Sequence, residues 1–162
     1  MILNAFTVFH VVLSLIGIGA GVVVVYALIE ARTLPGWTKL FLATTTATSV
    51  TGFFFPFHGF TPALALGVMS LIVLLIASLA LYRHRLPGPW RRTYAITAVI
   101  ALYFNVFVLV VQLFRRVPVL MALAPTQSEP PFQITQLAVL LLFAALGVRA
   151  ATKNAQRAIP PN

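Results

Sequence analysis

The sequence lacks cysteine and is poor in charge, above all in negative charge. Without cysteine, disulfide bonds and thiolate metal sites are excluded. Only 2 of the 162 residues are acidic, and neither lies within a long apolar run, so no carboxylate is placed to relay protons across a membrane. Charged residues make up 8% of the chain, against roughly a quarter in a soluble domain. Such a chain cannot cover its apolar surface in water.

The chain instead contains five apolar runs, which give it 60% hydrophobic residues and a mean hydropathy of +1.01. We expect transmembrane helices at 5–29, 40–57, 62–82, 94–114 and 132–148. The first would be roughly 37 Å long at about 1.5 Å per residue, enough to cross a hydrocarbon core of about 30 Å. The sequence therefore predicts an all-α polytopic membrane protein, a bundle of five transmembrane helices within residues 1–150.

Two shorter segments complete this prediction. Residues 117–124 are expected to form a short interfacial helix with Pro118 in its first turn. Pro125 should end that helix, because a proline disfavours helical geometry in the residue before it. The C-terminal segment 151–162 reads as a basic, polar and frayed tail.

The basic residues predict the orientation of the bundle. Nine of the eleven lie in the first connection, the third connection or the segment after the last run: Arg32, Lys39, Arg83, Arg85, Arg91, Arg92, Arg149, Lys153 and Arg157. Cytoplasmic connections carry the excess of Lys and Arg, so the N-terminus is expected outside and the C-terminus in the cytoplasm. The net charge of +9 is thereby assigned to membrane topology, and nucleic-acid binding is set aside.

Two histidines are expected in the outer half of the bundle. His10 lies within the first run, where an ionisable side chain is a functional candidate by default. His58 follows the second run, beside a proline and a glycine. Two imidazoles on adjacent helices can hold the iron of a haem b or another metal ion, which makes both candidate haem ligands. His58 fits equally well as a residue of an interfacial turn.

Small and hydroxyl side chains form stripes on the first two runs. His10, Gly17 and Gly21 share a helical face, and the two glycines form a pair that allows another helix to approach closely. In the second run, Thr44, Thr48 and Thr51 form a stripe of hydroxyls. Threonines in membrane helices usually bond to the carbonyl one turn earlier, so these residues are interpreted as packing positions and not as a polar pore.

Amide side chains gather on the last two runs. Asn105, Gln112 and Arg116 share a face of the fourth run, and Gln133 and Gln136 lie one turn apart at the start of the fifth. One interpretation is a structural network between helices, in which each contact contributes roughly 0.6 kcal/mol. The other is a polar pocket that opens toward the outer face.

The two arginines at the end of the fourth run favour the pocket. Arg115 and Arg116 oppose the charge bias, and Glu129 is the only acid expected on their side. An ion pair between them would fix the 117–131 connection over the mouth of the bundle, whereas a ligand bound by the arginines would be anionic. The predicted ligand-binding residues are His10, His58, Asn105, Gln112, Arg115, Arg116, Glu129, Gln133 and Gln136.

The segment 103–147, and especially the stretch ALAPTQSEPPF at 122–132, resembles a segment of small, uncharacterised multi-span proteins of bacterial inner membranes. This resemblance implies a multi-pass protein of the bacterial inner (plasma) membrane. It implies no activity and transfers no catalytic residue.

Three classes of function remain open. The first is binding of a small ligand or cofactor, either haem, a quinone or an anionic or lipid-like molecule, in the outer-half pocket. The second is a non-catalytic accessory or assembly subunit of a larger membrane complex, with another membrane protein or a second copy as partner in the lipid bilayer. The third is an enzyme with His10 or His58 as general base and Arg115 and Arg116 as anion clamp. The enzyme ranks last because it needs a nucleophile or carboxylate near the histidines.

Overall fold

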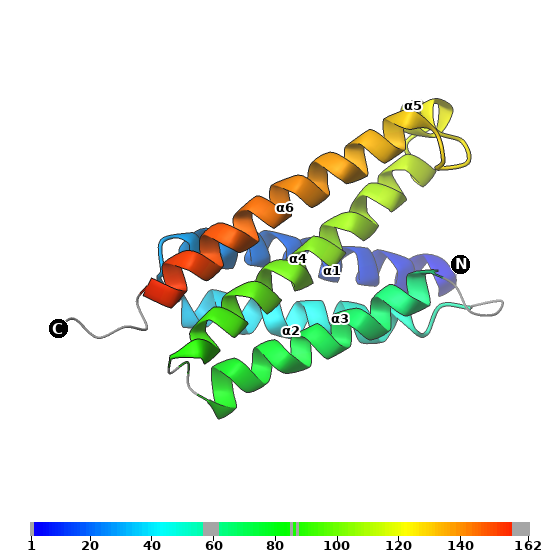
Figure 1. Ribbon diagram of the computed structural model, residues 1–162. Helices are drawn as coiled ribbons and strands as arrows, with labels where there is room; N and C mark the ends of the chain where they lie inside the picture. Colours follow the sequence, from blue (N-terminus) through cyan, green and yellow to red (C-terminus); the bar gives the residue numbers. More distant parts are fainter. Residues whose placement is uncertain (1, 57–61, 85, 87, 157–162) are drawn as a thin grey trace.

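The computed structural model describes residues 2–56, 62–84, 86 and 88–156, and every regular element in them is helical (Figure 1). The elements are α1 (Ile2–Ile29), α2 (Pro35–Gly52), α3 (Pro62–Ser78), the π-helical turn η1 (Leu79–Arg83), α4 (Pro89–Arg116), α5 (Pro118–Leu123) and α6 (Pro130–Gln156). All helices after α1 begin at a proline, apart from the turn η1, which continues α3. Proline suits this position because the first N–H of a helix has no helical partner and the ring fixes a helical φ.

The long helices run side by side, with α4 in the middle (Figure 1). The most extensive contacts join α1 to α2 and α4 to α6, and α4 also packs against α1 and α3. The first residues of α1, the last turn of α4, the short α5 and the start of α6 lie at one end, and α6 finishes at the opposite end (Figure 1). We call these the α5 end and the basic end, since the latter carries the basic connections.

Four helices in the described part of the chain are long and apolar enough to cross a membrane: Ala5–Ile29, Pro62–Arg83, Pro89–Arg116 and Pro130–Gln156. The protein is therefore a helical membrane protein, with four such helices where the sequence predicted five. The exception is α2, in which threonines replace the aliphatic residues of the other helices. It begins at Pro35, earlier than the predicted 40, and ends at Gly52.

The last helix is longer than the sequence indicated. α6 continues to Gln156, past the predicted end of the fifth run at 148. Asn154 lies in this added segment and is fully buried. Its Nδ2 donates to the carbonyl oxygens of Leu28 in α1, at 2.7 Å, and of Ala150, at 2.8 Å.

An arginine of α4 completes this arrangement. The Nε of Arg91 donates to Oδ1 of Asn154 at 2.9 Å, and its Nη2 donates to the carbonyl oxygen of Ala31 at 2.7 Å. Carbonyls at a helix C-terminus lack the helical donors that interior carbonyls have. Two side chains from other helices supply donors at the end of α1, and thereby join α1, α4 and α6 at the basic end.

Close packing of α1 depends on its glycines, as the sequence predicted. A Cβ atom on Gly21 would lie 2.6 Å from Cδ1 of Leu102 and 2.8 Å from Cε2 of Phe41, which is closer than real contacts allow. A Cβ on Gly17 would lie 3.2 Å from the hydroxyls of Thr44 and Thr45. Gly19, on the exposed side of the same helix, has no neighbour within 4 Å.

This difference predicts a graded effect on stability. Gly21→Leu should lower the free energy of unfolding by about 1–3 kcal/mol, because the added side chain must push α2 and α4 away from α1. Gly19→Leu is the matched control and should leave stability nearly unchanged, since its side chain meets lipid. Thermal unfolding of both variants in detergent, followed by circular dichroism, makes the comparison. Equal midpoints for the two variants would show that Gly21 is not at a packed interface.

Candidate functional site

A cavity of about 720 Å³ opens among α1, α2, α3 and α4 toward the α5 end. Its volume lies within the range of roughly 300–1,000 Å³ that is typical of small-molecule sites. Most of its lining is apolar, with aromatic side chains from the turn after α2 (Phe53 and Phe55) and from α4 (Phe104). The polar side chains that line it are Thr7, His10, Ser14, Thr48, Ser49, Ser70, Asn105, Gln112, Arg115 and Arg116.

The structure brings together five of the nine predicted site residues in this cavity: His10, Asn105, Gln112, Arg115 and Arg116. They come from α1 and α4 only, so the polar stripes of these two helices face the same space. His58, the second candidate haem ligand, lies outside the described residues.

The other three predicted residues do not line the cavity. Nε2 of Gln136 donates to the carbonyl oxygen of Phe107 at 3.2 Å, across the α4–α6 contact. Nε2 of Gln133 donates to the carbonyl oxygen of Ser128 at 2.8 Å, within the turn that precedes α6. These two amides therefore follow the structural interpretation, in which they hold neighbouring backbone segments.

The carboxylate of Glu129 is likewise bonded within the turn that precedes α6. It accepts hydrogen bonds from the hydroxyl and N–H of Thr126, at 2.9 and 3.2 Å, and from the N–H of Ser128 at 3.1 Å. Desolvation raises the pKa of Glu129, but the hydrogen bonds together outweigh it and hold the pKa below its usual value. Among the residues that the structure describes, no ion pair joins Glu129 to Arg115 or Arg116, so the first of the two alternatives for these arginines is not formed.

The connection is nevertheless held against α4, by other means. Nε2 of Gln127 donates to the carbonyl oxygen of Val111 at 2.9 Å. A small apolar cluster of Val110, Phe114 and Ala124 packs beneath it. The 117–131 connection thus covers the α4–α6 side of the α5 end, and the cavity opens on the other side of α4.

His10 is held in a defined orientation. Its Nδ1 lies 2.8 Å from Oγ1 of Thr51. The single proton of that hydroxyl is directed to the carbonyl oxygen of Ala47, at 2.7 Å. With that proton so directed, the Thr51 oxygen accepts a hydrogen bond from the N–H of Nδ1 of His10, and in the neutral ring this leaves Nε2 unprotonated. The ring also meets the edge of Phe55 at a centroid distance of 5.1 Å.

Asn105 and Thr48 are both buried in the cavity wall, but only the Asn105 amide has a hydrogen-bond partner among the described residues. Asn105 donates through Nδ2 to Oγ1 of Thr45 at 3.2 Å, and both side chains are buried, so this amide joins α4 to α2. Thr48 is 8% exposed, and its hydroxyl has no hydrogen-bond partner in the described part of the chain. It differs from Thr44 and Thr51, which bond to carbonyls of their own helix. The packing interpretation holds for those two threonines but leaves the Thr48 hydroxyl unexplained.

The mouth of the cavity is positively charged. Arg115 and Arg116 are exposed in the last turn of α4, and Nε of Arg116 lies 3.4 Å from Oε1 of Gln112. Cations are favourable at this position because the C-terminal end of a helix carries a partial negative charge. The sequence offered no structural reason for these arginines, and the helix end supplies one, while their place on the rim gives them access to a ligand.

Thr48, Ser49 and Ser70 also line the cavity and are not among the site residues predicted from the sequence. The hydroxyl of Ser49 donates to that of Ser70 at 3.1 Å, which joins α2 to α3 beneath the cavity. The available signal was Ser70, a hydroxyl in a run of aliphatic residues. Within the described residues, no group of three or more His, Asp or Glu side chains is arranged to hold a metal ion.

Comparison of the chain with protein families, with curated sequences and with solved structures gives no match.

Proposed function

We propose that the protein binds an amphipathic small molecule in the cavity among α1, α2, α3 and α4. The observation that carries this proposal is the unpaired hydroxyl of Thr48. A buried polar group without a partner costs roughly 1–3 kcal/mol, and its cost is larger where lipid replaces water. Thr48 lines the cavity although its Oγ1 is itself inaccessible, so a rotation about χ1 would bring the hydroxyl to a polar atom of a ligand there.

The other groups of the cavity suggest the chemistry of the ligand. Nε2 of His10 is an acceptor, so it suits a hydroxyl donor or a metal centre. Arg115 and Arg116 at the rim suit an anionic or strongly accepting group. The apolar walls suit a hydrocarbon or ring system. A quinol and an acidic, lipid-like molecule both combine these features, and His10 could hold haem b as a single axial ligand.

The proposal includes a membrane topology. We place all five long helices across the plasma membrane of a bacterium, with the N-terminus outside. α2 has 18 residues, about 27 Å of helix, which is close to the thickness of the hydrocarbon core. Thr38, Thr44, Thr45 and Thr48 are its buried polar residues, whereas Leu40 and Val50 are exposed. Most threonines of α2 thus face other helices, and Thr46 is the one that is exposed together with Leu40 and Val50.

Reporter fusions test this topology. Fusions after Lys39 and after Arg92 should report the cytoplasm, and a fusion after Thr126 should report the outside, because α2 and α4 each reverse the side of the chain. Alkaline phosphatase and green fluorescent protein form a suitable pair, since each is active on one side only. The same side for Lys39 and Thr126 would mean that one of α2, α3 and α4 does not cross the membrane, and would contradict the five-span arrangement.

Ligand binding is tested with the purified protein in detergent and three probes: a short-chain quinol, dodecanoate and haemin. One of them should raise the unfolding midpoint, and Thr48→Val should weaken its binding about five- to tenfold, as expected for one lost hydrogen bond. Thr44→Val is the matched control. Thr44 is equally buried but bonds to Leu40 and does not line the cavity.

The stability of the ligand-free protein separates this role from a structural one. Thr48→Val removes an unpaired hydroxyl, so the empty variant should be as stable as the wild type or more stable. A Soret band that depends on His10 would select haem among the probes. If no probe binds, and if protein purified from membranes carries no small molecule, the accessory-subunit function becomes the better conclusion.

A further inference from the structure

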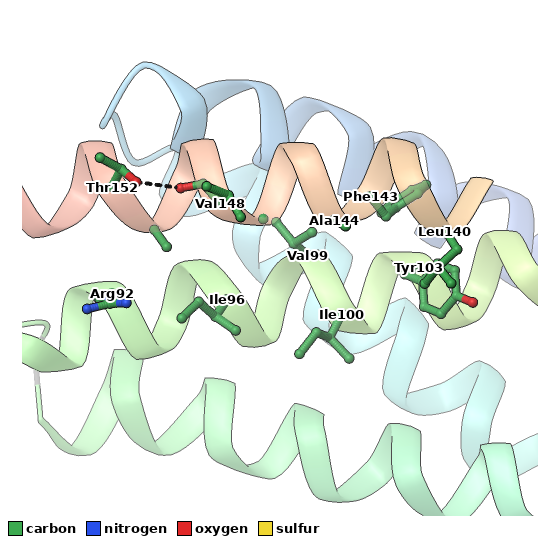
Figure 2. A pocket seen from close by; sticks show the side chains of 12 residues that line it. Arg92, Ile96, Val99, Ile100, Tyr103, Leu140, Phe143, Ala144, Val148 and Thr152 are labelled. Atoms are coloured by element: carbon green, nitrogen blue, oxygen red, sulfur yellow. Dashed lines mark hydrogen bonds between the residues drawn. The ribbon is translucent and has the colours of Figure 1, made fainter. Parts of the chain in front are cut away.

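A second hollow lies on the opposite side of α4, between α4 and α6 (Figure 2). It has a volume of about 440 Å³ and is lined by these two helices alone. Its walls are formed by aliphatic and aromatic side chains such as Ile96, Val99 and Phe143. One end is different, because Arg92 of α4 and Thr152 of α6 lie there, as Figure 2 shows. We call this hollow the α4–α6 groove.

The length of the groove matches one leaflet of a membrane. From Arg92 to Tyr103, α4 advances eleven residues, or about 16 Å. Half of a hydrocarbon core of about 30 Å is about 15 Å. With Arg92 at the membrane surface, the apolar part of the groove therefore reaches to the middle of the bilayer.

The charge at the open end is concentrated on one guanidinium. The neighbouring Arg91 is engaged with Asn154 and with the carbonyl oxygen of Ala31, so it serves the helix contacts. Arg92 is exposed at the rim of the groove, and no hydrogen bond to it is found within the described residues. Arg149 and Lys153 are exposed on the last turns of α6 and add positive charge nearby.

We propose that the α4–α6 groove binds an anionic phospholipid, with one acyl chain between the helices and the phosphate on Arg92. The apolar walls and leaflet length fit the chain, and the basic end fits the phosphate. A second copy of this protein is a poorer occupant, because two chains of net charge +9 would bring their basic ends together. This site is separate from the cavity that carries the proposed function.

The experiment uses the full-length protein in vesicles that contain equal amounts of phosphatidylglycerol and phosphatidylcholine. After mild detergent extraction, native mass spectrometry counts the lipids that remain bound. The wild type should retain phosphatidylglycerol in preference, and Arg92→Gln should reduce that preference about five-fold, as expected for one basic residue near an anionic surface. Arg92→Lys should preserve the preference, and Arg83→Gln should not affect it, since Arg83 is exposed at the same end but outside the groove.

A second pair of variants tests the place of the acyl chain. Ala144 lines the groove, whereas its neighbour Ala145 is equally exposed and does not line it. Ala144→Phe should fill the groove and release the bound lipid, and Ala145→Phe should leave it in place. Circular dichroism and size-exclusion chromatography establish that each variant is folded.

Three results would overturn the proposal. The first is equal retention of the two lipids by the wild type. The second is an unchanged lipid preference in Arg92→Gln. The third is a lipid-free dimer that Ala144→Phe dissociates, which would assign the groove to a second copy.

Discussion

The rest of the fold depends on the buried amide of Asn154. It donates to the end of α1 and to its own helix, and it accepts from Arg91 at the start of α4. Because lipid supplies no hydrogen-bond partners, helix ends near the membrane must find them in the protein. Three helices are therefore joined tightly at the basic end. Most buried residues of α4 lie between Tyr94 and Asn105, and the cavity opens only beyond that segment, toward the α5 end.

Much of the fold follows from the sequence because apolar runs and prolines act locally. The short helix α5 begins at Pro118 and ends before Pro125, as predicted. The sequence was less informative where polar groups pair across helices. Average hydropathy counts each threonine of α2 as polar, although hydroxyls such as that of Thr44 are bonded within the helix. It likewise suggested a polar tail where α6 continues and buries Asn154, because the partner carbonyl of Leu28 is 126 residues away.

The sequence predicted the site residues that share a helix face, but not the hydrogen-bond partners that form in loops or between helices. Helical spacing placed Asn105, Gln112 and Arg116 on one face, and all three line the cavity together with His10. Helical spacing does not predict which donors a loop residue such as Glu129 will bond to. Glu129 was assigned to distant arginines, but donors within three residues of it were closer. Thr48 was hidden because a helical threonine usually bonds to its own backbone, and only the packed structure reveals the exception.

The central proposal is that a ligand in the cavity pairs with the hydroxyl of Thr48. Its most direct test is an experimental density map of the protein in nanodiscs made from the membranes in which it was produced. We expect non-protein density in the cavity, with polar atoms within hydrogen-bond distance of Oγ1 of Thr48 and of Nε2 of His10. A cavity filled by protein side chains, or a Thr48 hydroxyl bonded to its own helix with no density beside it, would contradict this prediction.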